Sequence, residues 1–286
     1  MKDKNVLNSP RLNQLKRKKQ RAARRKVSLC LLLFLVVFFG LAFISRIHRL
    51  NIKEVSVSGN QVVENAVIKE IVQTDLAGKY LGLFPRTNFL LYPKNKIKSD
   101  LEKRIKRLEN ISFDLKKNQA LEISVSEYEG EYLWCGVSVP TLPAELKEPC
   151  YFMDSNGYLF DQAPYFSGKV YFKFYGPVNN PAILGSYFLP DSFANLVSFK
   201  KNLELMNLKP TALGIEANGE GNFFLVSVPI IGPKIIFKLD ADFGEIAENL
   251  KSALDTEPLH TDFIKKFSSL LYLDLRFSNK VYYKFK

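Results

Sequence analysis

The chain has 286 residues, 47% of them hydrophobic, which is enough for one large hydrophobic core or two smaller ones. Its net charge at pH 7 is +12, from 41 Lys and Arg against 29 Asp and Glu, but residues 1–26 hold 11 of the basic residues and one of the acids. The rest of the chain therefore carries 30 basic and 28 acidic side chains, a net +2, which argues against a nucleic-acid-binding domain.

The uncharged stretch at residues 27–44 follows this basic tail directly. Its eighteen residues, VSLCLLLFLVVFFGLAFI, would span about 27 Å as a helix, enough to cross a bilayer. A cleaved signal peptide is the alternative, but its apolar region is usually about 7 to 15 residues long and ends at a small-x-small site, which Phe43, Ile44 and Arg46 do not provide. We therefore expect a basic cytoplasmic tail at 1–26 that touches anionic lipid heads, and a transmembrane helix at 27–47 with the remaining chain outside.

Two periodicities follow in the next segment. Val55 and Val57 alternate with serines, as in a half-buried strand, whereas the apolar residues of 63–72 recur at helical spacing. A second amphipathic helix is predicted at 93–108, and alternation on both sides of the turn KKNQ predicts a hairpin at 110–127. Each strand has one apolar side, so the three strands should pack one face against the two helices.

This strand, helix, helix, strand, strand order begins with the motif V-x-V-x-G-N and lies just after a single predicted anchor. Residues 50–128 resemble a POTRA domain, a module that generally binds other polypeptides. Two features depart from the family pattern, because Glu64 stands where a hydroxyl residue commonly caps the first helix and KKNQA lacks the expected proline turn. The apolar loop at 76–92 is expected to tuck between the two helices.

From residue 129 onward the pattern is mainly of short strands. Helices are predicted at about 191–207 and 242–254, and the chain ends in a strand, a turn and a last strand. Cys135 and Cys150 would lie outside the membrane, where disulfides persist, so a disulfide between them is one hypothesis. Two small buried or half-buried side chains are the alternative. The predicted fold class is therefore α+β, with a mainly antiparallel β domain and flanking helices at 129–286.

Several weak features together give a more specific likeness. The basic tail and single anchor, the POTRA-like domain, a Trp-containing strand soon after SVSE, the hairpin FMDSNGYLF and the terminal YLDLRFSNKVYYKF occur in this order along essentially the whole chain. The sequence resembles the FtsQ/DivIB family of bacterial cell-division proteins. This resemblance implies a non-enzymatic divisome scaffold at the septum that binds FtsB-like and FtsL-like single-pass proteins and links early and late division proteins, with the septal wall synthases left open as further partners.

The C-terminal strand is the predicted partner site. No later strand exists to pair with it, so unless an earlier strand closes over it, its outer edge presents unpaired N–H and C=O groups. Tyr282 should share a face with Lys280 and Lys284, while Val281 and its alternate neighbours share the other. In the family this end is where an FtsB-type partner adds a strand, so the resemblance implies partner contacts at Phe277, Ser278, Val281, Tyr282, Tyr283 and Phe285. An ordinary final strand with blunting lysines is the alternative.

Side chains suited to catalysis or metal binding are scarce in the region predicted to lie outside the membrane. The chain has two histidines, His48 and His260, which leaves little material for a His-based triad or metal site. No catalytic residue, metal site or cofactor is therefore expected. The competing hypothesis is a membrane-anchored cell-envelope hydrolase that uses two carboxylates as acid and base.

Overall fold

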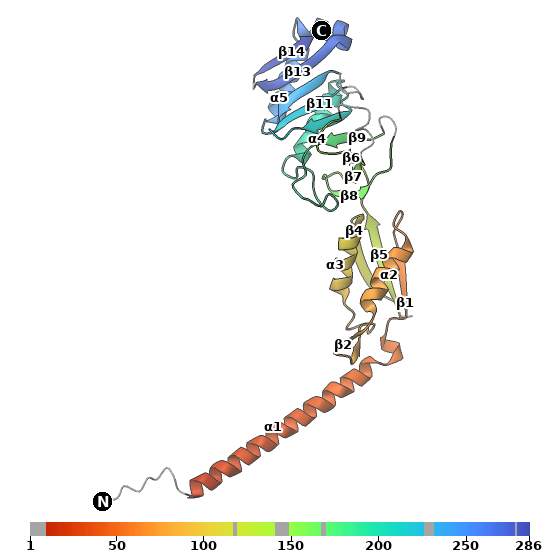
Figure 1. The fold of residues 1–286 in the computed structure, drawn as a ribbon, viewed down its shortest axis with the longest axis vertical. Coiled ribbons are helices and arrows are strands. Elements are labelled where there is room, and N and C mark those ends of the chain that lie inside the picture. Colours follow the sequence, from red (N-terminus) through yellow and green to blue (C-terminus); the bar gives the residue numbers. More distant parts are fainter. Residues whose placement is uncertain (1–9, 117–118, 141–148, 167–169, 226–231, 278) are drawn as a thin grey trace, which may run out of the picture. The chain divides into compact units, whose positions relative to one another are not determined.

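The computed structural model describes residues 10–116, 119–140, 149–166, 170–225, 232–277 and 279–286 (Figure 1). The chain divides into two compact units, which are described separately. The first comprises Met1–Arg104 with Asn110–Ser126, and the second comprises Ile105–Glu109 with Glu127–Lys286. Together they form a mixed α+β structure with one long apolar N-terminal helix, as the sequence predicted.

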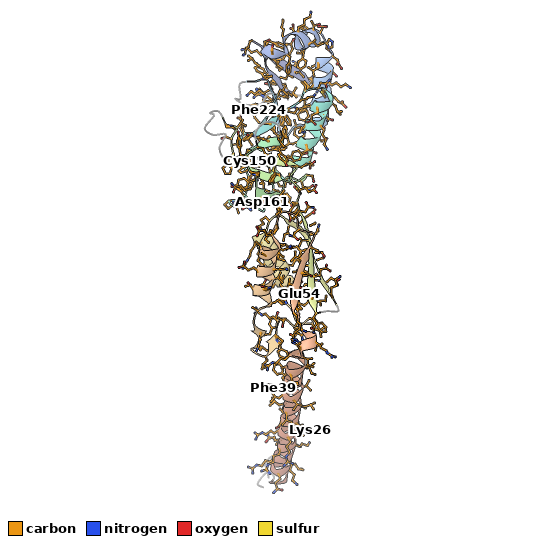
Figure 2. All side chains as sticks on the ribbon, turned by 90° about the vertical axis from the view of Figure 1, so that its right-hand side faces the viewer. Lys26, Phe39, Glu54, Cys150, Asp161 and Phe224 are labelled. Atoms are coloured by element: carbon orange, nitrogen blue, oxygen red, sulfur yellow. A yellow bond between two sulfur atoms is a disulfide. The ribbon has the colours of Figure 1, made fainter. Side chains whose placement is uncertain are left out.

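The N-terminal helix α1 spans Pro10–Ser45, so it begins well inside the basic tail. Lys, Arg, Gln and Ala are good helix formers, which explains why the helix continues through residues that a span of 27–47 leaves out. It ends two residues before the predicted boundary, and a short 3-10 turn, His48–Leu50, follows. Lys26 and Phe39, labelled in Figure 2, lie on its basic and apolar parts. By length and composition α1 can cross a membrane.

After α1, the first unit contains a three-stranded sheet, two further helices and a small two-stranded sheet. The strands lie in the order β1-β5-β4, and β1 runs parallel to β5. Its core joins buried side chains of both helices to those of the central strand, among them Ile68, Val72, Ile97, Leu101 and Ile123. The elements are β1 (Glu54–Ser58), α2 (Asn65–Leu76), α3 (Lys94–Arg104), β4 (Leu108–Leu115) and β5 (Ala120–Glu127).

Two details of this unit differ from the sequence expectation, namely the end of the second helix and the loop at 76–92, whereas Glu64 agrees with it. The second helix ends at Arg104, so Leu108, which fits the helical stripe by spacing, is the first residue of β4 instead. Glu64 is the N-cap of α2 as expected, but its side chain makes no capping hydrogen bond. The loop at 76–92 contains a small hairpin, β2 (Lys79–Tyr80) and β3 (Phe84–Pro85), that contacts the end of α1.

The second unit is built on one nine-stranded sheet in the order β14-β13-β12-β11-β10-β9-β6-β7-β8. Five of its eight pairings are antiparallel and three are parallel, so the sheet is mostly antiparallel as predicted. The strands are β6 (Tyr132–Trp134), β7 (Tyr151–Met153), β8 (Leu159–Gln162), β9 (Phe172–Tyr175), β10 (Ala212–Ile215), β11 (Glu220–Phe224), β12 (Lys234–Lys238), β13 (Leu270–Phe277) and β14 (Lys280–Phe285).

Helices α4 (Phe193–Leu205) and α5 (Phe243–Leu254) supply the other half of this core. Phe199 of α4 packs edge-on against Phe223 and Phe237 from neighbouring strands, with ring centroids 5.6 Å away in both cases. The sequence pattern predicts no helix between residue 254 and the terminal strands. The structure has helix α6 (Leu259–Lys266) in this segment, followed by a 3-10 turn, Phe267–Ser269. Helix α6 buries Leu259 on its apolar side.

Candidate partner-binding edge

Strand β14 forms one edge of the large sheet. Among the described strands it pairs only with β13, in antiparallel register from Leu270 opposite Phe285 to Phe277 opposite Lys280. Two register shifts interrupt this pairing. In the sheet as described, the outer side of β14 therefore has no neighbouring strand, which is the geometry that accepts an added strand.

The side chains of β14 alternate between the core and solvent. Val281, Tyr283 and Phe285 are half-buried and pack against the main core of this unit. Lys280, Tyr282 and Lys284 are exposed on the opposite face. The two-residue period of the sequence predicted this division, and Val281, Tyr283 and Phe285 contribute to the stability of the unit through these core contacts.

The exposed side of the edge also has an aromatic pair. The rings of Phe277 and Tyr282 lie 5.0 Å apart in an edge-to-face arrangement, and the two residues are 51% and 48% exposed. Lys280 and Lys284 of β14, and Lys286 just after it, are also exposed. Ser278, the remaining predicted contact residue, lies outside the described residues. The structure thus brings Phe277 and Tyr282 together as the accessible apolar part of the predicted site.

Sequence reasoning missed an ion-pair cluster beside this edge. Arg276 donates to both carboxylate oxygens of Asp274, at 2.9 and 2.7 Å, and to Glu220 Oε1 of β11 at 2.7 Å. Asp274 is buried, lies directly opposite Tyr282 and raises the pKa of the Arg276 guanidinium by hydrogen bonding, with a smaller effect from Glu220. The spacing Asp-Leu-Arg on one strand face was visible in the sequence, but the position of Glu220 was not.

This cluster stabilises the register next to the edge. Because Asp274 has its charge compensated by a fixed guanidinium, a buried carboxylate can lie under the exposed face at a lower desolvation cost. Arg276 also connects β13 with β11 across the intervening strand β12. Strand β13, with which β14 pairs, is therefore held in place by ion pairs as well as by the apolar core.

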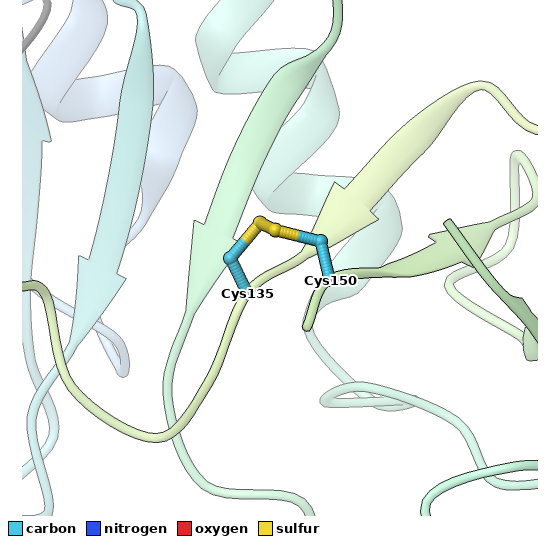
Figure 3. Close-up of a disulfide and its surroundings, with 2 residues drawn as sticks. All are labelled: Cys135 and Cys150. Atoms are coloured by element: carbon cyan, nitrogen blue, oxygen red, sulfur yellow. A yellow bond between two sulfur atoms is a disulfide. The ribbon is translucent and has the colours of Figure 1, made fainter. Parts of the chain in front are cut away.

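Cys135 and Cys150 lie in the part of the sheet far from β14, next to β6 and β7. Cys135 and Cys150 form a disulfide with sulfur atoms 2.04 Å apart, shown in Figure 3. They flank the paired strands β6 and β7, in which Trp134 lies opposite Tyr151. Trp134 itself donates its indole N–H to the carbonyl of Gly176 at 3.0 Å inside the core. The disulfide therefore joins two strands that are already hydrogen-bonded to each other.

Two cavities among the described residues have acidic side chains in their lining, which bears on the hydrolase hypothesis. A cavity of about 610 Å³ beside β10 and β11 has Glu216 as its one acidic lining residue. A second, of about 470 Å³, is lined by Asp240 and Asp242, but Asp242 Oδ1 accepts the backbone N–H groups of Gly244 and Glu245 as the N-cap of α5. Within the described ranges, no group of three or more His, Cys, Asp or Glu is placed to hold a metal ion.

No protein-family model matches the chain, and a comparison with curated proteins finds no match. The likeness to FtsQ/DivIB proteins therefore rests on the order of sequence features described above.

Proposed function

We propose that this protein is a membrane-anchored, non-enzymatic scaffold of the FtsQ/DivIB type, with a POTRA-like first domain and a partner-binding C-terminal domain. It holds FtsB-like and FtsL-like single-pass proteins at the division septum and so links early and late division proteins. In this proposal α1 crosses the cell membrane once, with the N-terminus in the cytoplasm, and both folded units lie outside.

The observation that carries the proposal is the open edge at β14. A strand that ends the sheet, packs one face into the core and presents an exposed Phe277–Tyr282 pair on the other supports binding by strand addition. The added strand would satisfy the backbone groups of β14, and its side chains would cover the aromatic pair. Lys280, Lys284 and Lys286 favour an acidic partner segment and disfavour pairing with a second copy of this chain.

The test is capture of partners from bacterial membranes with the full chain and two matched variants. Tyr282→Glu places a charge on the exposed edge, and Tyr187→Glu is its control. The two tyrosines are 48% and 47% exposed, and each ring lies 5.0 Å from one aromatic neighbour, Phe277 or Tyr158. Both variants should therefore lose similar stability, whereas only Tyr282→Glu should lose anchored coiled-coil proteins from the captured fraction.

Point variants are preferable to deletion of residues 280–286. The deletion would remove Val281, Tyr283 and Phe285 from the core, so lost binding would follow from lost folding as well as from a lost edge. Undiminished capture by Tyr282→Glu and by a charge placed at Ser278 would move the partner site away from β14, in the first instance to the POTRA-like domain. Capture of no membrane protein by the unmodified chain would favour the hydrolase hypothesis.

A further inference from the structure

The small hairpin in the first unit reaches alongside the apolar part of α1. In this hairpin Tyr80 pairs with Phe84, and Leu81, Gly82 and Leu83 form the tip. The ring of Phe84 lies 5.4 Å from that of Phe38 on α1, and Arg46 Nε donates to the carbonyl of Leu83 at 3.1 Å. Figure 1 shows β2 beside the C-terminal end of α1.

The depth of this contact follows from helix geometry. Phe38 lies six residues before Ile44, where the uncharged stretch ends. At 1.5 Å per residue, Phe38 is about 9 Å inside the end of that stretch. If α1 leaves the hydrocarbon at Ile44, the ring of Phe84 in the hairpin, which packs on Phe38, therefore lies inside the hydrocarbon layer.

The hairpin and the loop after it expose large apolar side chains at this end of the unit. Leu81 is 80% exposed and Leu90 is 77% exposed, and Leu91 and Tyr80 are exposed to a smaller degree. Leu81 also adopts a left-handed backbone conformation, with φ of 50°, which is unfavourable for a residue with a Cβ. Single exposed leucines are common on soluble proteins, but here they flank a helix that is itself apolar and exposed.

Hydrogen bonds fix the position of this surface along the axis of α1. The side-chain amide of Asn88, which is buried, donates to the carbonyl of Ser45 at 3.0 Å. Asn51 donates to the same carbonyl at 3.1 Å and to that of Ile47 at 2.8 Å. The Ser45 carbonyl is the last of α1 and has no partner within the helix, whereas the Ile47 carbonyl just beyond it also accepts the backbone N–H of Leu50 at 2.9 Å. The two amides therefore cap the end of α1 and attach the folded unit to it.

We infer that the hairpin tip at 80–84, together with Leu90, inserts into the outer lipid–water boundary of the membrane that α1 crosses. The lipid acyl chains would cover Leu81 and Leu90, while Tyr80, with the Arg86 guanidinium 5.2 Å from its ring centroid, lies at the headgroup level that aromatic and basic side chains prefer. This inference rests on the proposed insertion of α1 but not on a division role. Its consequence is that the first unit is held against the bilayer instead of moving freely on a tether.

Spin labels on the full chain in nanodiscs of phosphatidylethanolamine and phosphatidylglycerol test this directly. Cys30 is the one free cysteine in the described residues, so a Cys30→Ser background accepts a single new label while Cys135 and Cys150 remain bonded. Labels at Leu81→Cys and, independently, Leu90→Cys should collide with oxygen more than with a water-soluble nickel chelate. The oxygen-to-nickel ratio should be several-fold higher than for a water-exposed site.

Two further labels make the outcome decisive. Val62→Cys is the water-exposed control, since Val62 is 62% exposed and follows β1, whose five residues lead about 16 Å away from the α1 end. Val36→Cys, also 62% exposed in the described unit, reports on α1 itself. A lipid signal at Val36 with water signals at both Leu81 and Leu90 would overturn the hairpin inference alone. A water signal at Val36 would overturn the anchor and the inference together.

Discussion

Glycine 59 gives a quantitative test of the first unit. It ends the VSVSG segment with φ of +85°, and a Cβ at this position would overlap the backbone carbonyl oxygen of Val125 on β5. Gly78 has nearly the same conformation, φ of +92°, but a Cβ there would meet nothing within 4 Å. The variants Gly59→Ala and Gly78→Ala therefore share the conformational cost and differ in the overlap.

The expected magnitude follows from this difference. A left-handed conformation costs a non-glycine residue roughly 1–2 kcal/mol, and the entropy that alanine removes from the unfolded chain offsets both variants equally by about 0.4–1 kcal/mol. Overlap with backbone that cannot rotate away should cost Gly59→Ala about 1–3 kcal/mol more, as overpacking does. This is a further loss of about five- to 150-fold in the folding equilibrium constant of the first unit.

Hydrogen exchange of the full chain, followed by mass spectrometry, measures this loss separately for each unit. The slowest amides of β1 and β5 should exchange about five- to 150-fold faster in Gly59→Ala than in Gly78→Ala, provided that they exchange by unfolding of the unit. Amides of β11 and β12 in the second unit serve as an internal reference and should not change. Equal exchange rates in the two variants would show that the close approach of β1 and β5 at Gly59 is not as described.

Three other predictions concern the second unit and the proposed topology. Cys135 and Cys150 are 15 residues apart, so reduction of their disulfide should lower the free energy of unfolding of the second unit by on the order of 3 kcal/mol. Its melting temperature, measured by tryptophan fluorescence, should then fall by about 6 to 12 °C. Mass spectrometry should find the unreduced chain two hydrogens lighter than the dithiol. Burial raises the pKa of Tyr175 from 10.0 to about 12, so the stability that the neutral phenol contributes should be complete below pH 10 and be lost between pH 10 and 12. Over this range the free energy of unfolding, measured by chemical denaturation, should fall by about 2 to 3 kcal/mol more in the unmodified chain than in Tyr175→Phe. A reporter active only outside the membrane should work when fused after Lys286 and fail when fused before Lys2, and the opposite pattern would contradict the proposed topology.

Local patterns in the sequence predicted most of the elements. The alternation around Val55 and along β14 reflects the two-residue period of a strand with one buried face, and the structure has both strands at those positions. Errors arose where one pattern fits two structures. Leu108 has helical spacing from Leu101, but it belongs to a strand because its neighbours pair in the sheet instead of continuing α3.

Long-range arrangement was not readable in the same way. The parallel pairing of β12 with β13 joins strands separated by α5 and α6, and nothing in either strand specifies its neighbour. Glu220 reaches Arg276 only because β11 lies two places from β13 in the sheet. The same limit explains why the apolar loop at 76–92 was expected between helices, since its hydrophobicity required a covering surface without indicating that α1 contacts it.

The way β14 is built bears on how a partner would bind. Val281, Tyr283 and Phe285 already pack against the core, so this strand is ordered before any partner arrives and its backbone needs little further ordering. The conformational cost of strand addition then falls on the incoming segment, which must become extended along an edge that the Arg276 cluster and the core hold in place. Specificity in such a complex would come from the alternate side chains of the added strand that meet Phe277 and Tyr282, because the backbone hydrogen bonds are the same for any sequence.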